Sequence, residues 1–208
     1  MNLGRITTFL LLVLVFIASA RLALVKAQTA ATSTQTVERR DDAAAAAAFE
    51  AIVPVLHHPR CMNCHSSGDY PRQGDDSHRH TMQVRRGPGG AGEGVVGCSS
   101  CHQDHNLNGP HTPPGAPDWH LPPPGMPMIW QGLSDRQLCE LFKDPSQNGA
   151  RTPQEIVEHM HTPLVLWGWH PGEGRTPVPM SQTEFLAKVQ EWASKGGACP
   201  TEPTTRRP

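Results

Sequence analysis

Two copies of one short motif carry most of the chemistry that this sequence can perform. The pattern C-x-x-C-H occurs at residues 61–65 and again at residues 98–102, as Cys61, Cys64, His65 and Cys98, Cys101, His102. In this pattern the two cysteine sulfurs can form thioether bonds with the two vinyl groups of a haem, and the histidine can bind the iron. The sequence therefore predicts two covalently attached haems of c type, with the two histidines as proximal iron ligands.

Two other kinds of site also use paired cysteines. A structural zinc site could use both C-x-x-C pairs, but residues 65–97 separate them, more than in a usual zinc ribbon, and zinc does not require a histidine after each pair. A thioredoxin-like redox pair is expected within a βαβ pattern, and neither motif has such surroundings. Haem attachment is the preferred interpretation, and zinc is the alternative.

The N-terminal segment has the features of a secretory signal. Arg5 is the only charge before an apolar run from Phe9 to Ala20, and small residues that fit a cleavage site follow up to Ala27. The run is short for a membrane span, so we expect residues 1–27 to be a cleaved signal peptide, with membrane anchoring only if this segment stays uncleaved. Export to the periplasm or beyond suits haem attachment of this type, which occurs outside the bacterial cytoplasm.

Composition predicts a small domain that is rich in loops. The chain has 21 Pro and 19 Gly, and its 18 Lys and Arg nearly balance 19 Asp and Glu. The absence of a basic run argues against a nucleic-acid partner. We expect a flexible linker at 28–40, one mainly α-helical domain with abundant coil at 41–200, and a disordered tail at 201–208. Two haems would supply much of the apolar core of this domain.

Several segments have clear helix signals. Acidic residues at 41–42 and Pro54 bracket a predicted helix of roughly 12 residues, whose apolar end, with Phe49, is expected beside the first haem. Capping boxes begin at Ser134 and Thr152, and a third N-terminal signal begins at Ser181. In the last of these helices, the three apolar residues at i, i+4 and i+7 are expected in the core and not among the ligands. These residues are Phe185, Val189 and Trp192.

Each haem iron needs a sixth ligand or an open position. The candidates for distal ligands are His80, His120 and His159, followed by His58. His80 is preferred only narrowly over His78. The proline-rich segment 110–127 and its neighbours are expected to cover the haem edges with the side chains of Trp119, His120, Met126, Met128 and Trp130. Three arginines are candidates for the haem propionates, namely Arg60, Arg85 and Arg86.

Two cysteines lie outside the motifs. In an exported protein Cys139 and Cys199 most simply form a disulfide, which would pin the last helix to an earlier one.

The chain resembles the exported dihaem cytochrome c superfamily through its two C-x-x-C-H units. The phrases HPRCMNCH at 58–65 and PGAPDWHLP at 114–122 also resemble small bacterial proteins labelled as isoquinoline 1-oxidoreductase subunits. The second resemblance implies a molybdenum hydroxylase as the redox partner. Since this chain has no recognisable molybdopterin site, it would relay electrons without oxidising the heterocycle.

These features predict a small dihaem cytochrome c domain that transfers electrons between a donor and an acceptor protein. The alternative is a haem enzyme, such as a peroxidase or a small-molecule reductase, in which one iron stays five-coordinate. A gas sensor is a third hypothesis. Binding of carbon monoxide would separate the last two from the first.

Overall fold

The computed structural model describes residues 40–93 and 96–202. The predicted signal peptide, the predicted linker up to residue 39 and residues 203–208 lie outside this range. Within the described ranges, no helix has both the length and the apolar character that crossing a bilayer requires.

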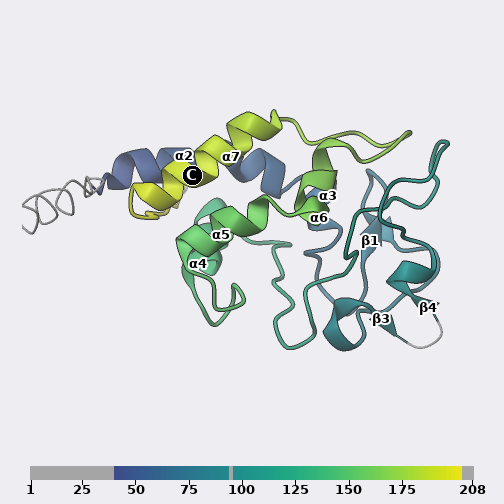
Figure 1. The fold of residues 1–208 in the computed structure, drawn as a ribbon. Helices are drawn as coiled ribbons and strands as arrows, with labels where there is room; N and C mark the ends of the chain where they lie inside the picture. The colour runs from purple at the N-terminus through teal and green to yellow at the C-terminus, as the bar shows by residue number, and fades with distance from the viewer. Residues whose placement is uncertain (1–39, 94–95, 203–208) are drawn as a thin grey trace, which may run out of the picture. The chain divides into compact units, whose positions relative to one another are not determined.

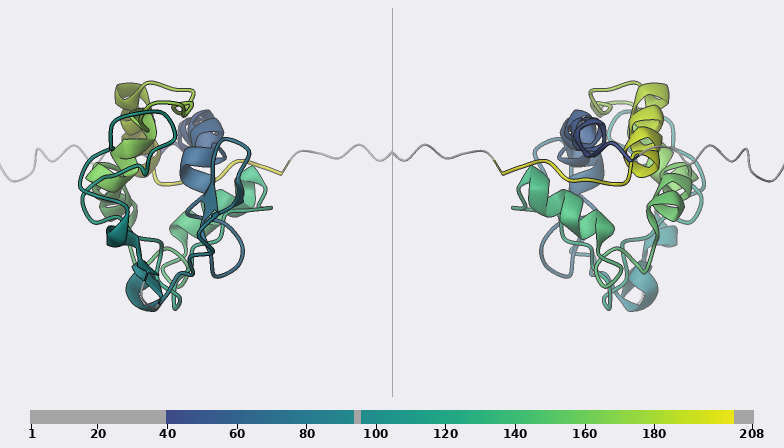
Figure 2. Two further views of the ribbon diagram at one scale, coloured as in Figure 1. Left: turned by 90° about the vertical axis from the view of Figure 1, so that its right-hand side faces the viewer. Right: turned by 90° about the vertical axis from the view of Figure 1, so that its left-hand side faces the viewer.

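Helices α2 (Asp42–Leu56) and α7 (Gln182–Ser194) pack side by side (Figure 1; right-hand view of Figure 2). Asp41 caps α2 by accepting a hydrogen bond from the Ala44 N–H at 3.0 Å. The Asp41 N–H in turn donates to the Lys195 carbonyl oxygen at 2.9 Å, which joins the start of α2 to the end of α7. The two helices therefore bring the beginning and the end of the domain together.

The predicted end of the first helix at Pro54 is wrong, because α2 continues to Leu56. Pro54 is exposed and lies in the last turn, where its missing N–H removes a single hydrogen bond. Val55 and Leu56 are at most 1% exposed, and their burial offsets that loss. The extra turn matters for the site described below, since Leu56 reaches it.

Helices α4 (Asp135–Lys143) and α5 (Pro153–Met160) begin as the sequence predicts. Both capping boxes are present, one between Ser134 and Gln137 and one between Thr152 and Glu155. The chain then forms the short helices α6 (Pro163–Leu166) and η3 (Trp167–Trp169). Each cap is worth about 1 kcal/mol and fixes where the helix begins.

Aromatic side chains from different helices form the centre of the core. The Phe49 ring lies 5.7 Å from that of Phe142 in α4 and 5.6 Å from that of Trp192 in α7. Trp130 continues the cluster, 5.3 Å from Phe142. The predicted core residues Phe185, Val189 and Trp192 are 0–1% exposed, which confirms that prediction. Phe49 therefore packs within the helical core.

The middle of the chain is built from short elements and long loops. Strands β1 (Arg72–Gln73) and β2 (His78–Arg79) pair antiparallel, as do β3 (Gly92–Glu93) and β4 (Val96–Gly97). The remaining short helices are α3 (Pro59–Met62), η1 (Pro88–Gly90) and η2 (Cys98–Ser100). Residues 103–134 contain neither helix nor strand, as their proline content predicts.

Cys139 in α4 and Cys199 after α7 form a disulfide, with their Cα atoms 5.5 Å apart. Beside this bond, the Arg136 guanidinium donates to the Pro200 carbonyl oxygen at 3.1 Å. Glu202, within the predicted tail, accepts a hydrogen bond from Ser134 at 2.7 Å. These contacts hold the C-terminal segment against the beginning of α4.

Replacing Cys139 and Cys199 together with alanine is expected to lower the free energy of unfolding by roughly 3–4 kcal/mol, because the bond closes a loop of 60 positions. Denaturant unfolding followed by circular dichroism measures the change. Reduction of the wild-type disulfide should have a similar effect, which makes it the control. A loss below about 1 kcal/mol would mean that packing alone holds α7 against α4.

Candidate functional site

The first motif forms one tight turn that begins in α3. The N–H groups of Cys64 and His65 both donate to the Cys61 carbonyl oxygen, at 3.2 Å. His58 caps the start of α3, where its Nδ1 accepts a hydrogen bond from the Arg60 N–H at 3.3 Å. The turn places both cysteines and His65 in the lining of one cavity of about 350 Å³, the first cavity.

The second motif has the same backbone pattern in different surroundings. The N–H groups of Cys101 and His102 donate to the Cys98 carbonyl oxygen, at 3.2 and 2.9 Å. Both cysteines and His102 line a cavity of about 330 Å³, the second cavity. The repeated spacing thus gives repeated local geometry, and each motif has its own cavity.

Both motif histidines are held through the same ring nitrogen. His65 Nδ1 lies 2.9 Å from the Met128 carbonyl oxygen, and His102 Nδ1 lies 2.7 Å from that of Pro114. A carbonyl oxygen only accepts, so Nδ1 carries the proton and Nε2 keeps its lone pair. Burial lowers the pKa of His65 to about 3 and also lowers that of His102, so both rings are neutral near pH 7. A metal-binding histidine needs this tautomer and this second contact.

A tryptophan stacks on each of these imidazoles. The rings of Trp130 and His65 are nearly parallel, at 2° and 3.6 Å between centroids. Trp119 and His102 stack in the same way, at 3° and 4.5 Å. Each histidine is therefore fixed by a hydrogen bond at Nδ1 and by an aromatic face. No sequence pattern predicts these two pairs, because each tryptophan lies far along the chain from the histidine on which it stacks.

Three of the motif cysteines have raised thiol pKa values, which keep them neutral near pH 7. Burial raises the pKa of Cys61 to about 12 and that of Cys64 to about 11, and it also raises the pKa of Cys98. All four motif cysteines are unpaired. Dithiol oxidoreductases need a lowered thiol pKa, which is the opposite of what is found here. Within residues 40–93 and 96–202, no three His, Cys, Asp or Glu side chains are grouped around a possible ion position.

The first cavity lies between the helical core and the proline-rich segment. Leu56 from α2 and Phe142 from α4 contribute apolar surface, and His159 and Met160 contribute from α5. All five side chains that were expected to cover a haem edge line this cavity, namely Trp119, His120, Met126, Met128 and Trp130. The wall is mainly apolar with few polar groups, as in sites that bind a large flat cofactor.

The second cavity is built mostly from loops. Much of its lining comes from residues 71–74 around β1, residues 80–82 and 84 after β2, and residues 111, 113 and 114. Five side chains line both cavities and form a shared wall, namely Arg60, Cys64, Trp119, His120 and Trp167. The rings of Trp119 and Trp167 meet edge to face in this wall, with centroids 5.0 Å apart. Two cofactors in these cavities would be close neighbours.

Three of the four distal candidates line the cavities. His159 lines the first cavity, His80 the second, and His120 both. Burial lowers the pKa of His159 to about 4, so its ring is neutral and able to bind a metal. His58 is outside the lining of both cavities, because it caps α3. The geometry therefore favours the other three candidates over His58.

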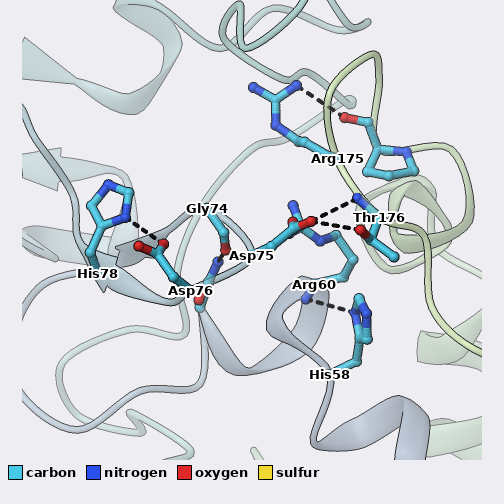
Figure 3. Close-up of polar contacts among 10 residues, drawn as sticks. His58, Arg60, Gly74, Asp75, Asp76, His78, Arg175 and Thr176 are labelled. Atoms are coloured by element: carbon cyan, nitrogen blue, oxygen red, sulfur yellow. Dashed lines mark hydrogen bonds and ion pairs between the residues drawn. The ribbon is translucent and has the colours of Figure 1, made fainter.

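His80 and His102 line the same cavity, with 6.2 Å between the ring centroids and 63° between the ring planes. Two imidazoles that bind one metal ion from opposite sides, each at about 2 Å, have centroids roughly 6 Å apart. His80 Nδ1 accepts a long hydrogen bond of 3.3 Å from the Met82 N–H, so the proton of the neutral ring is on Nε2. To bind a metal through Nε2, the ring must move this proton to Nδ1 and give up the hydrogen bond. His78 instead pairs with Asp76, at 2.6 Å, and does not line the second cavity (Figure 3).

Buried donors without acceptors test whether these cavities fit a haem. Trp130 Nε1 in the first cavity and Arg72 Nε in the second are buried and have no partner in the described part of the chain. Arg60 Nε, in the shared wall, is also buried and unpartnered there. Such donors are costly unless an acceptor arrives. Haem propionates are acceptors, so the donor set fits haem.

Two of the expected propionate partners have other roles. Arg85 forms an exposed ion pair with Asp69. Arg86 is buried, and its guanidinium donates to the carbonyl oxygens of Gly68 and Pro122. Arg86 therefore ties two loops together and does not reach either cavity lining. Arg72 does line the second cavity. It was not among the candidates from the sequence, because no motif near Arg72 indicates that it binds an anion.

Comparisons of the chain with protein-family models, with curated proteins and with solved structures gave no match.

Proposed function

We propose that this protein is an exported electron carrier with two covalently attached c-type haems, which relays electrons between redox partner proteins. One observation carries the proposal. In both motifs the two cysteines and the histidine line the same cavity, and the histidine donates through Nδ1 to a backbone carbonyl so that Nε2 is free to bind iron. Thiol oxidoreductases do not need this combination.

The haems would supply reversible one-electron chemistry, and the chain supplies attachment, orientation and exclusion of water. The six motif residues would hold the two groups, namely Cys61, Cys64, His65, Cys98, Cys101 and His102. Trp130 and Trp119 keep the two imidazoles in a fixed plane. A fixed ligand reduces the structural change that accompanies each change in oxidation state, which favours fast electron transfer.

A carrier is favoured over a catalyst because each cavity also contains a second histidine. His159 is available in the first cavity and His80 in the second. With both positions filled, neither iron has an open site for peroxide or another small substrate.

The second site is the better contact point for a partner protein. Cys101 is exposed, whereas Cys61 and Cys64 are only partly accessible. Electrons would therefore pass between a partner and the second site, and through the shared wall to the first. The disulfide between Cys139 and Cys199 supports placement in the periplasm or another oxidising compartment.

The test is the visible spectrum of protein produced with a haem-attachment system, recorded oxidised, reduced, and reduced under carbon monoxide. We expect c-type bands, two haems per chain in a pyridine haemochrome assay, and no response to carbon monoxide. A carbon monoxide shift in the wild type would replace the carrier by the haem enzyme. Absence of covalent haem, with bound zinc instead, would overturn the proposal.

A further inference from the structure

Arg60 occupies an unusual position between the two cavities. It directly precedes Cys61, and its side chain is 2% exposed. It lines the first and the second cavity alike. Its guanidinium carbon lies 5.7 Å from the ring centroid of Trp167, another member of the shared wall. A permanent positive charge is thus placed where both cofactors would meet it.

The neighbours of Arg60 satisfy only part of this charge. One terminal nitrogen pairs with Asp75 Oδ1, and the Asp75 side chain is 45% exposed. The other oxygen of Asp75 accepts hydrogen bonds from the Thr176 N–H and hydroxyl, at 3.1 and 2.7 Å, so this carboxylate is shared with a second loop (Figure 3). Arg60 Nε is buried and has no partner in residues 40–93 and 96–202.

A buried guanidinium with a free donor is a site for an anion. Arginine offers five N–H donors in a rigid fork that matches carboxylates. Burying such a charge without full compensation costs several kcal/mol. The anions that would enter both cavities are the propionate carboxylates of the haems, and one guanidinium has enough donors for a carboxylate on each side as well as Asp75.

We propose that Arg60 is a single anchor for both haems, binding a propionate of each and adding its positive charge to both redox sites. This inference rests on the proposed function. A nearby positive charge stabilises the reduced form of a haem, which carries one positive charge less, and a poorly solvated wall strengthens that effect. Arg60 therefore raises the midpoint potentials of both haems.

The test is a redox titration, followed spectroscopically, of the two-haem protein with Arg60→Gln. Both steps of the titration should move to lower potential than in the wild type. Arg72→Gln is the matched control, because Arg72 also has a buried unpartnered Nε but lines only the second cavity. It should move one step and leave the other unchanged.

Two further variants guard against loss of folding in Arg60→Gln. Arg60→Lys keeps the charge and should leave both potentials closer to wild type. Asp75→Asn removes the negative charge that pairs with Arg60. The positive charge of Arg60 is then less compensated, so both steps should move to higher potential. Opposite signs for the two charges cannot come from general loosening of the fold.

The outcomes separate this inference from the proposed function. A protein without covalent haem would refute the proposed function. A protein with two haems in which Arg60→Gln moves one step or neither would refute the shared anchor alone. The anchor is also refuted if Arg72→Gln moves both steps equally. An arginine that lines one cavity would then shift both potentials, so a shift of both would not require an arginine that contacts both haems.

Discussion

If the proposed function holds, replacing Cys61 and Cys64 together with alanine is expected to remove one of the two proposed haems and most of the stability of the helical core. The first cavity borders α2, α4 and α5 through Leu56, Phe142 and Ile156. Without its cofactor, about 350 Å³ of mainly apolar space remains in contact with the core. Unfilled apolar cavities destabilise in proportion to their volume, so the loss should reach several kcal/mol.

The matched variant replaces Cys98 and Cys101, and its effect on stability should be much smaller. The second cavity is bounded mainly by loops, so loss of its haem should loosen these loops and leave the helices folded. Each double variant should contain one haem per chain by pyridine haemochrome, and urea unfolding followed by circular dichroism should separate them. Equal destabilisation would contradict the assignment of the first site to the helical core.

Local sequence rules were sufficient for the elements that position the sites. The capping boxes at Ser134 and Thr152 place α4 and α5, because side-chain capping depends on residues three positions apart. Proline density explains why residues 103–134 have no helix or strand. The helix end predicted at Pro54 is wrong because tertiary packing, which buries Val55 and Leu56, outweighs the local helix-ending signal.

The candidate site was predictable where its residues are contiguous and not where folding brings distant residues together. The turn geometry of C-x-x-C-H follows from five neighbouring residues. The hydrogen bond from His65 to Met128 spans 63 positions, and no pattern in the sequence indicates which carbonyl will accept it. The lower rank of His58 likewise depends on the cap that its Nδ1 makes with the Arg60 N–H, a contact that competes with any other role of that nitrogen.

The shared wall brings the two motifs into contact with common residues. Cys64 belongs to the first motif but also lines the second cavity. Cys98 and Cys101 of the second motif line that same cavity, so cysteines of both motifs contribute to one wall. Attachment at one motif would therefore shape the wall of the other cavity. Electron exchange between the sites would then need no path beyond this wall.

Replacing His80 with alanine is expected to make one of the two haems reactive toward carbon monoxide. His80 lines the second cavity together with His102, at a centroid distance suited to two ligands of one iron. Loss of this ligand should open the iron, change the optical spectrum of that haem, and raise its midpoint potential if a weaker ligand takes the position. Carbon monoxide difference spectra should account for half of the total haem.

His78→Ala is the control, two positions away on the same segment. His78 is exposed, pairs with Asp76, and is absent from the second cavity lining, so its replacement should leave the spectrum, the potentials and the inertness toward carbon monoxide unchanged. If His80→Ala behaves like His78→Ala, His80 is not a ligand. His120, which lines both cavities and keeps Nε2 free because its Nδ1 donates to the Asp118 carbonyl oxygen, is then the residue to replace next.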